Sequence, residues 1–399
     1  MSPKERSILT VTCFGHFMSH FNMLVFPAVL LPLSAQLGMD MGQTLALSFW
    51  MYLLFGVTAL PWGLLADRFG SRPLLLLFHL GAGVCGFLAA MNMSNPFILS
   101  LCLAGIGLFS GIYHPVGLGW IARDFENTSQ GMAYNGMFGN LGLAAAPLLA
   151  GFVNYLWGAE AVYLLLGVVN GSGLILLYFA REGHVGHQPG RKKTHRQGTL
   201  APFLVLLVAM MLGGIVYRAT TITLPAYFEL QNSSLYQSFL TISGQFGSPN
   251  LFATLIISTI YLVGMAGQYV GGRVGNKIDL GRGYLLFHLI TIPAVLLMAV
   301  TSDIPLVIFA MIHSFFLLGM QPLENTLVAR LSPPELHSSA FGLKFVLTFG
   351  VGALSVSMVS LVKGTFGFSA VYVALAIVST TLVSVIMLLN HYRKVAPTT

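Results

Sequence analysis

Residues 63–73 read GLLADRFGSRP and place glycine and charge between two long apolar segments. Gly63 lacks a side chain, so a neighbouring helix can approach it closely. The Asp67 carboxylate can accept hydrogen bonds from helix-end amides or pair with an arginine. Such a charge cluster can lock one conformation and release in another; the alternative is that the charges only set topology. We expect the conformational role for five residues of this loop: Gly63, Asp67, Arg68, Gly70 and Arg72.

The composition of the chain is that of a membrane protein. Of its 399 residues 56% are hydrophobic and 8% are charged, with a mean hydropathy of +0.81. An average soluble domain carries about 25% charged residues. A globule of this size cannot hide so much apolar surface, whereas a bilayer can. The composition therefore excludes a soluble enzyme, and no motif in the chain indicates a cofactor.

Apolar segments of membrane-spanning length recur along the whole chain. We predict an all-α membrane protein with twelve transmembrane helices. The predicted spans are residues 8–35, 44–65, 74–92, 97–122, 131–157, 160–180, 201–226, 251–275, 284–300, 305–330, 340–362 and 369–391. The polar residues 227–248 are expected to form a long external loop.

The placement of basic residues predicts the orientation. The net charge is +7, but the arginines and lysines alternate with the apolar segments and form no patch suited to nucleic acid. With twelve spans, nearly all of them fall on the side of the two termini, and only Lys363 falls in a loop on the other side. By the positive-inside rule both termini are cytoplasmic, in a multi-pass protein of the cell (inner) membrane.

Two halves of the chain resemble each other. Residues 113–123 (YHPVGLGWIAR) align with residues 320–330 (MQPLENTLVAR), at the offset of 207 that separates Pro115 from Pro322. We predict two pseudo-symmetric six-helix bundles, residues 1–182 and 200–399, joined by a cytoplasmic linker over residues 183–199. Parallel repeats of this kind build many secondary transporters, with the substrate site between the repeats.

The loop at residues 63–73 resembles the signature loop of the major facilitator superfamily, G-x-x-x-D-R-x-G-x-R. A degenerate copy follows the eighth predicted span, with Gly272, Asn276, Lys277 and the pair Gly281-Arg282. The broad resemblance covers nearly the whole chain. It implies the major facilitator fold and a transporter, here expected to be a monomer, that moves a small molecule through the lipid bilayer.

A narrower resemblance rests on short motifs in the first, fourth and fifth spans. These are Gly15-His16, Gly105-Ile106-Gly107, Tyr113-His114-Pro115, Gly139-Asn140-Leu141-Gly142 and residues 147–151, PLLAG. Together they resemble the fosmidomycin-resistance exporter group, which implies proton-driven efflux of a small compound. The chain departs from that group at His20 and Val116, where the group tends to carry acidic residues. The glycines of the fifth span also predict close helix packing and a bend.

Three charges fall inside predicted spans: Arg218, Glu324 and Lys344. Each costs about 2.5–3.5 kcal/mol at a helix centre on insertion scales, so each is expected to face a partner or a wet cavity. Glu324 and Lys344 lie at similar depths, so they can form a pair, which is either functional or a structural tie. Arg218 suits an anionic substrate group, with structural pairing as the alternative.

Four histidines in predicted spans are candidates for proton coupling, because neutral imidazole exchanges protons near physiological pH. His16 and His20 are four residues apart and share a helix face. His313 lies eleven residues before Glu324, which also predicts one face, and His114 lies in the cytoplasmic half of the fourth span. The alternative for each is a hydrogen-bonded packing role. No third ligand is adjacent to His16 and His20 in sequence, so we predict no metal site.

These patterns predict a proton-coupled transporter, most simply an exporter that works by alternating access. The alternatives are an importer or uniporter of a small organic anion, suggested by Arg218 and Lys344, and a non-transporting membrane sensor or scaffold. An ATP-driven pump is disfavoured, because the sequence has no G-x-x-x-x-G-K-[ST] loop.

Overall fold

The computed structural model describes residues 1–180, 200–332 and 337–395, and every regular element in these ranges is a helix. Helices satisfy their own backbone hydrogen bonds, which a bilayer requires of any segment that crosses it. Ten described helices are long and apolar enough to cross a membrane, or eleven when Met41–Val57 and Ala59–Phe69, bent by 46°, are one span.

The longest helix, α9 (Thr128–Phe179), contains two of the predicted spans. At about 1.5 Å per residue its 52 residues far exceed the thickness of a bilayer. The helix is broken at Gly158, whose φ of 83° and ψ of 174° are not helical. Gly367 has nearly the same conformation (φ 86°, ψ 172°) between the last two helices. When α9 is divided at Gly158 and the bent pair is taken as one span, the described residues contain the twelve spans that the sequence predicts.

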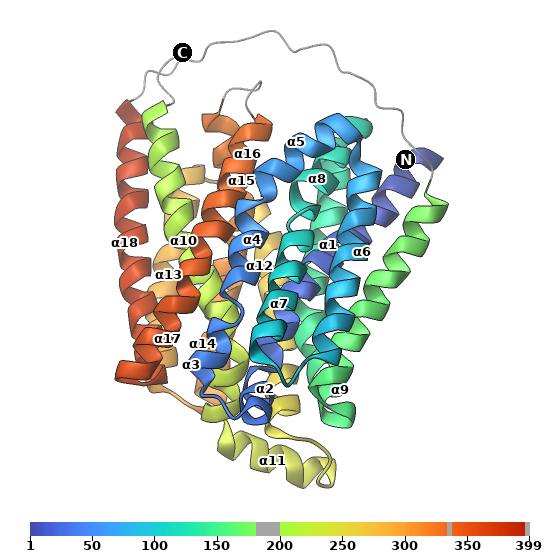
Figure 1. Ribbon diagram of the computed structural model, residues 1–399. Helices are drawn as coiled ribbons and strands as arrows, with labels where there is room; N and C mark the ends of the chain where they lie inside the picture. Colours follow the sequence, from blue (N-terminus) through green and yellow to red (C-terminus); the bar gives the residue numbers. More distant parts are fainter. Residues whose placement is uncertain (181–199, 333–336, 396–399) are drawn as a thin grey trace. The chain divides into compact units, whose positions relative to one another are not determined.

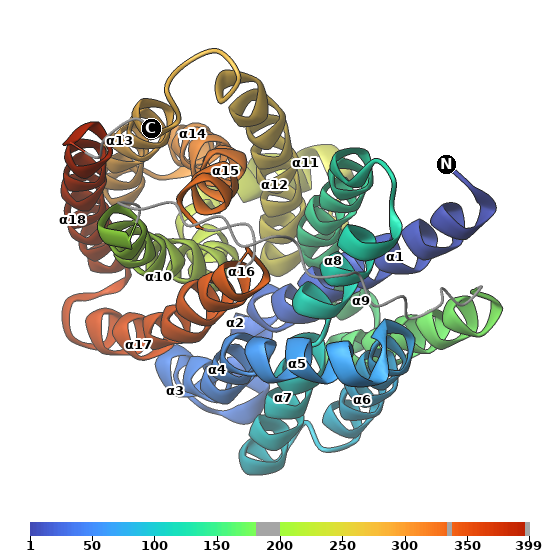
Figure 2. The same cartoon turned by 90° about the horizontal axis from the view of Figure 1, so that it is seen from above.

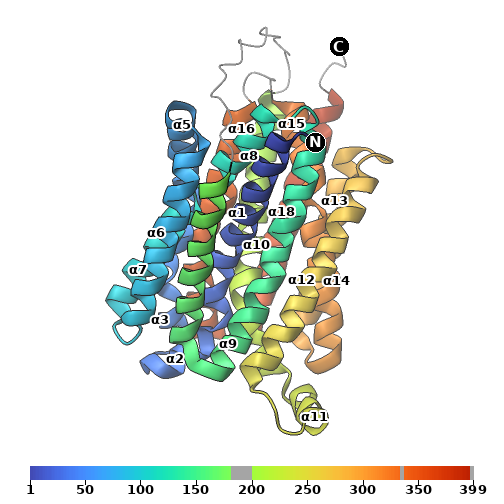
Figure 3. The same ribbon diagram turned by 90° about the vertical axis from the view of Figure 1, so that its right-hand side faces the viewer.

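The chain forms two compact units, and the first comprises the described parts of residues 1–186 and 221–259. Figure 3 shows α1, α9 and α6 side by side in this unit. Its helices are α1 (Pro3–Ala28), α2 (Leu30–Leu37), α3 (Met41–Ala46), α4 (Phe49–Val57), α5 (Ala59–Phe69), α6 (Ser71–Met91), α7 (Pro96–Ser110), α8 (Tyr113–Asp124), α9 and α11 (Ser233–Ser243), with the end of α10 (Leu200–Gln231) and the start of α12 (Pro249–Val274).

The second unit comprises the described parts of residues 187–220 and 260–399. In Figure 2, a view along the helices, α13 lies beside α18 and α14. Its helices are the first part of α10, the second part of α12, α13 (Leu280–Val300), α14 (Asp303–Gly319), α15 (Gln321–Leu331), α16 (His337–Phe345), α17 (Leu354–Phe366) and α18 (Phe368–Val395). The predicted linker, residues 183–199, lies outside the described residues, so the predicted bundle boundary stays a prediction.

Each unit contains one span that breaks at the position of the sequence repeat. α7 ends at Ser110 and α8 begins at Tyr113, whereas α14 ends at Gly319 and α15 begins at Gln321. Pro115 and Pro322 stand in the first turn of the helix that follows each break, where proline costs no intrahelical hydrogen bond. The two aligned sequences therefore build the same broken helix (Figure 1).

The eleventh predicted span, residues 340–362, is not one continuous α-helix. A π-helical turn (Val346–Gly350) and a 3₁₀ turn (Val351–Ala353) separate α16 from α17. A Cβ at Gly214 of α10 would overlap the carbonyl oxygen of Thr348, so the two backbones touch here. This close approach accompanies the local change of helical pitch, and π turns are frequent at functional sites.

Residues 227–248 were expected to be a loop, which is wrong. α10 continues to Gln231, and α11 then occupies residues 233–243. No residue of α11 is buried, although Phe239 packs on Phe252 at the start of α12 with ring centroids 5.1 Å apart. The extension of α10 also brings Glu229, expected outside the membrane, into a spanning helix.

The orientation can be tested by thiol labelling in a variant without native cysteines. A cysteine at Gln237, an exposed position of α11, is expected to react with an impermeant maleimide added to intact cells. A cysteine introduced between residues 185 and 195 is expected to react only after permeabilisation, because the arginines and lysines there favour the cytoplasm. The reverse pattern would overturn the predicted orientation.

Close packing of the fifth span is confirmed. An added Cβ at Gly142 of α9 would overlap the carbonyl oxygen of Phe17 on α1. At Gly139, one turn earlier, a Cβ would stand 2.5 Å from Nε2 of His16. The absence of side chains at these glycines lets α1 and α9 approach each other, and this contact fixes the position of His16.

Candidate functional site

The predicted pair of Glu324 and Lys344 forms in the second unit. Lys344 Nζ lies 2.7 Å from Glu324 Oε1, and the two side chains are only 8% and 3% exposed. The hydroxyl of Tyr284 on α13 donates to Glu324 Oε2 at 2.8 Å. Lys344 also donates to the side-chain oxygen of Asn325. Both oxygens of this buried carboxylate therefore have a partner, which offsets the cost of removing it from water.

Two buried histidines of the second unit lie beyond this ion pair. His288 follows Tyr284 by one helical turn, with ring centroids 4.8 Å apart, and interacts electrostatically with Glu324. His313 interacts electrostatically with His288, and its Nε2 lies 3.1 Å from the Thr220 hydroxyl. All three side chains of the series Tyr284, His288 and His313 are buried. Tyr284 is therefore hydrogen-bonded to Glu324, and the two histidines are buried in the same unit.

The sequence analysis missed Tyr284 and His288. Their spacing of four residues in an otherwise apolar helix is the signal that would have found them. His313 lies on α14 and Glu324 on α15, with Met320 between the two helices, and their shared face stays a prediction. His313 and His288 are both buried in the second unit.

Removal of the cation from this pair is expected to destabilise the protein. In Lys344→Met the Glu324 carboxylate stays buried without its counter-ion, and loss of one partner of a buried pair costs about 3–5 kcal/mol. The melting temperature in detergent should fall by several degrees. The double variant Glu324→Gln with Lys344→Met should regain part of the loss, and a double variant less stable than the single one would contradict this electrostatic account.

Arg218 of α10 lies against the interrupted span. Its side chain is 2% exposed, and its guanidinium carbon stands 6.0 Å and 5.9 Å from the ring centroids of Tyr217 and Phe349. Phe349 belongs to the π-helical turn, and Gly352 follows it close to the Cβ of Arg218. A buried guanidinium with aromatic faces beside it can bind a planar anionic group.

The signature loop makes the arginine contact expected for Asp67. Its Oδ1 lies 3.8 Å from Arg123 Nη1, where α8 ends, and the Asp67 side chain is 76% exposed. Arg123 also donates to the Ser71 hydroxyl at 2.6 Å. Gly63 lies on Pro115, since an added Cβ would stand 3.4 Å from the proline Cβ. The loop thus ties α5 and α6 to α8 near the break in the fourth span.

The remaining loop residues have different roles. Arg68 stands over the ring of Phe69, with its guanidinium carbon 5.3 Å from the centroid. Gly70 separates α5 from α6 with a φ of 87°. Arg72 donates to the carbonyl oxygens of Leu177 (3.1 and 3.2 Å) and Tyr178 (3.3 Å), so it joins the start of α6 to the end of α9.

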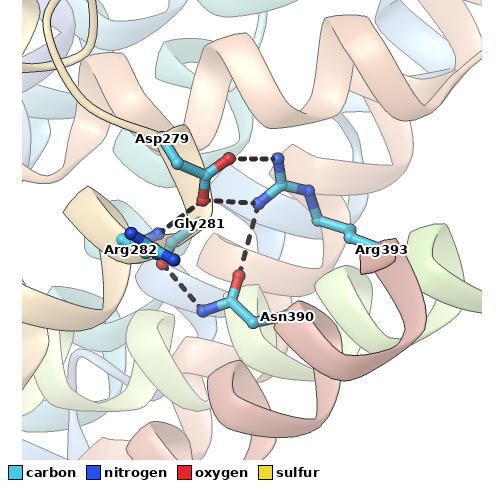
Figure 4. A network of polar contacts seen from close by, with 5 residues as sticks. All are labelled: Asp279, Gly281, Arg282, Asn390 and Arg393. Atoms are coloured by element: carbon cyan, nitrogen blue, oxygen red, sulfur yellow. Dashed lines mark hydrogen bonds and ion pairs between the residues drawn. The ribbon is translucent and has the colours of Figure 1, made fainter. Parts of the chain in front are cut away.

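The second unit has a corresponding tie, in which an ion pair replaces the hydrogen bonds from Arg72 to backbone carbonyls. Asp279, 207 residues after Arg72, pairs with Arg393 at 3.0 Å and joins the start of α13 to the end of α18 (Figure 4). Asn390 supports it by donating to the carbonyl oxygen of Gly281 at 3.0 Å. Gly272 faces Pro322 as Gly63 faces Pro115. The degenerate motif therefore retains the contact between glycine and proline, although its charges differ.

The pKa of Asp279 reflects this tie. Partial burial alone would raise the pKa of the carboxyl, but hydrogen bonds from Arg393 and from the backbone amide of Arg282 outweigh burial and hold it below its usual value. Because the pKa is lower in the folded state, the carboxylate stabilises the protein above pH ~4 and loses this effect as the pH falls through the folded-state pKa.

Asp279→Asn is therefore expected to lower the melting temperature slightly at pH 7, since partly exposed pairs contribute about 0.2–1 kcal/mol. The difference from the unchanged protein should shrink towards about pH 3. Thermal unfolding at both pH values provides the measurement. An undiminished difference at low pH would show that the effect is not electrostatic.

Three predicted histidines come together in the first unit. Ring centroids of His16 and His20 on α1 lie 5.0 Å apart, and that of His114 on α8 lies 5.2 Å from His16 and 5.3 Å from His20. His16 Nδ1 lies 2.9 Å from the backbone oxygen of Asn135 and 2.8 Å from its side-chain oxygen. Sequence alone placed His114 on a separate span, and the packing of α8 against α1 brings it here.

A carboxylate, a guanidinium and several histidines lie buried within spanning helices, and each repeat contains a helix that breaks at the aligned sequence. These features define a multi-pass membrane transporter, not an enzyme. The family model of the Major Facilitator Superfamily matches residues 12–247, and the chain belongs to this superfamily.

Similar proteins agree with this class. The chain is 24% identical over 385 residues to the multi-drug resistance efflux pump PmrA of Streptococcus pneumoniae, covering 92% of each. It is 32% identical over 139 residues to the class B tetracycline resistance protein of Escherichia coli, covering 33% of each. Its fold matches a bacterial homologue of the human lysosomal transporter Spinster, with a TM-score of 0.76, 13% identity, and coverage of 100% of this chain and 99% of that one.

Proposed function

We propose that this transporter is a proton-coupled exporter of small organic compounds, with Glu324 as the group that exchanges the proton. The observation that carries the proposal is the buried Glu324–Lys344 pair, since a carboxylate is kept in a spanning segment only where a partner or a function compensates its cost. The export direction is supported by the similarity to PmrA and to the class B tetracycline resistance protein.

The coupling step follows from the two states of the pair. While Lys344 is close, its ammonium favours the charged carboxylate of Glu324. When a conformational change separates the two groups, burial favours the protonated acid instead. Tyr284, His288 and His313 then form the route by which the proton reaches or leaves Glu324. A cycle that alternates these states couples one proton to one conformational change.

The expected cellular context is the cell membrane, with both termini in the cytoplasm and the protein working as a monomer. The narrower resemblance to the fosmidomycin-resistance exporters supports efflux of a small compound. His20 and Val116 stand where that group tends to carry acidic residues, so Glu324 takes the coupling role in this proposal.

A second candidate is uptake or facilitated diffusion of a small organic anion. Arg218 favours it, because a guanidinium that is 2% exposed and flanked by aromatic rings suits an anionic group. Lys344 adds a second buried cation. The direction of flux against a proton gradient distinguishes the two candidates.

The test begins with the purified protein and a panel of metabolites and antibiotics. A compound that binds the folded state raises the melting temperature. Such a compound is then added to proteoliposomes of known orientation that contain a pH-sensitive dye. Exchange of substrate for protons in opposite directions supports the exporter. Movement of both in one direction, or substrate flux without proton flux, would contradict it.

A further inference from the structure

The three histidines of the first unit have the arrangement of a metal site. One ring nitrogen from each of His16, His20 and His114 lies within 4.8 Å of the other two. In the part of the chain that the structure describes, no other group of three or more His, Cys, Asp or Glu side chains could hold an ion. His114 is 6% exposed, while His16 and His20 retain more exposed surface through which an ion can enter.

The surroundings of His16 resemble the outer shell of a metal site. The Nδ1–H of His16 donates to Asn135, which leaves the lone pair of Nε2 for a ligand. Asn135 is itself held by Tyr113, which donates to its side-chain oxygen at 3.0 Å and accepts from its side-chain nitrogen at 2.7 Å. Because Gly139 has no side chain, the His16 ring packs directly against the backbone of α9, which holds the ring in place. The imidazole is thus fixed in one tautomer and one orientation.

We propose that His16, His20 and His114 bind a divalent transition-metal ion. Imidazole suits Zn²⁺, Ni²⁺ and Cu²⁺, whereas Mg²⁺ and Ca²⁺ prefer oxygen ligands. With Zn–N bonds of about 2.0–2.1 Å, the three nitrogens would lie about 3.3 Å apart, so small side-chain rotations close the site. The i, i+4 pair on α1 supplies two ligands from one face, and α8 supplies the third.

The ligand set also determines what else binds. Three neutral imidazoles leave the double positive charge of the ion uncompensated, and a buried charge is costly without a counter-ion. The fourth coordination position of a tetrahedral ion stays open for water or a small anion. The site therefore fits a metal ion together with an anionic ligand, a property separate from the proton exchange proposed for Glu324.

Titration calorimetry of the detergent-purified protein tests the proposal without a transport assay. The protein carries no histidine tag, and His184, His187 and His195, which lie outside the described residues, are changed to asparagine to remove background binding. Addition of Zn²⁺, and separately Ni²⁺, is expected to show one site per chain, whereas Mg²⁺ should produce no signal. Absence of one-to-one binding for both transition metals would overturn the proposal.

Variants then assign the ligands. Each of His16→Gln, His20→Gln and His114→Gln is expected to weaken Zn²⁺ binding by about a hundredfold or more. Asn135→Leu is expected to weaken it by about tenfold, since outer-shell substitutions cost about 10–100-fold in metal affinity. Melting temperatures measured without metal show whether each variant is folded. If one of the glutamine variants does not fold, Asn135→Leu still tests the site, because it preserves all three ligands.

His79→Gln is the matched control. His79 is a buried histidine of the same unit, and its Nδ1 lies 3.3 Å from the side-chain oxygen of Asn170, but it is not part of the cluster. Its loss is expected to leave Zn²⁺ affinity unchanged. Equal affinity in the three cluster variants and the background protein would overturn the assignment, as would an equal loss in His79→Gln. The outcome is independent of whether Glu324 couples transport to protons.

Discussion

Glu324→Gln is expected to abolish transport driven by a pH gradient while exchange of substrate at equilibrium survives. Glutamine keeps the size of the side chain and can still accept from Tyr284, but it cannot bind or release a proton. If the transporter without substrate must protonate Glu324 before it can change conformation, its cycle would therefore stop. The transporter with bound substrate could still change conformation and exchange that substrate. Proteoliposome assays with and without a pH gradient measure both activities.

Glu229→Gln provides the control for that experiment. Glu229 also lies in a spanning helix and accepts a hydrogen bond from Asn250 at 3.0 Å, but it belongs to the first unit. Gradient-driven transport is expected to survive this substitution. Retention of full gradient-driven transport in Glu324→Gln would place the proton elsewhere. Loss of both activities in folded Glu324→Gln protein would instead favour a structural role for the ion pair.

Asp67→Asn is expected to slow transport by about tenfold or more, which corresponds to about 1.4 kcal/mol in the barrier between conformations. In the present conformation the contact with Arg123 is long and exposed, so the variant should fold and insert normally. We call the contact between Asp67 and Arg123 the latch, because it is expected to hold one conformation and to release in the other. Its expected effect on the rate depends on the free-energy difference between the conformations, not on the stability of one of them.

Asp124→Asn is the matched control for the latch. Asp124 ends the same helix as Arg123 and pairs with Lys4 at 3.3 Å, outside the signature loop. Its substitution is expected to leave the transport rate near that of the unchanged protein. Initial rates normalised to the amount of protein in the membrane give the comparison. A normal rate in Asp67→Asn would favour the simpler view that the loop charges only set topology.

Much of the fold follows from local features of the sequence. Apolar length predicted where the helices lie, because a bilayer requires each crossing segment to bury its backbone hydrogen bonds in a helix. The pair Pro115 and Pro322 predicted a repeat, and both prolines begin the helix after a break. The sequence was less informative over residues 227–248. Their polar side chains suggested a loop, whereas the structure has α11 there, a helix without buried residues.

The candidate sites divide in the same way. Glu324 and Lys344 could be paired from sequence, since adjacent spans and equal depth leave them few other partners. Tyr284 and His288 could not be joined to them, because the rotation of α13 about its axis is decided by packing against α15 and α18. Depth is a local property of a span, but the direction in which a side chain points around the helix is not.

The histidine cluster shows this difference most clearly. The spacing of His16 and His20 placed both on one face of the first span, but the sequence alone indicated no third histidine beside them. Only the tertiary structure brought His114 within reach, because α8 packs against α1, where Gly15 leaves room for the ring of Tyr113. Sequence thus determined the helices, their repeat and the charges they carry. Packing between helices distant in the chain decided which of those charges and rings meet, since such contacts depend on helix rotation and close approach that no local pattern records.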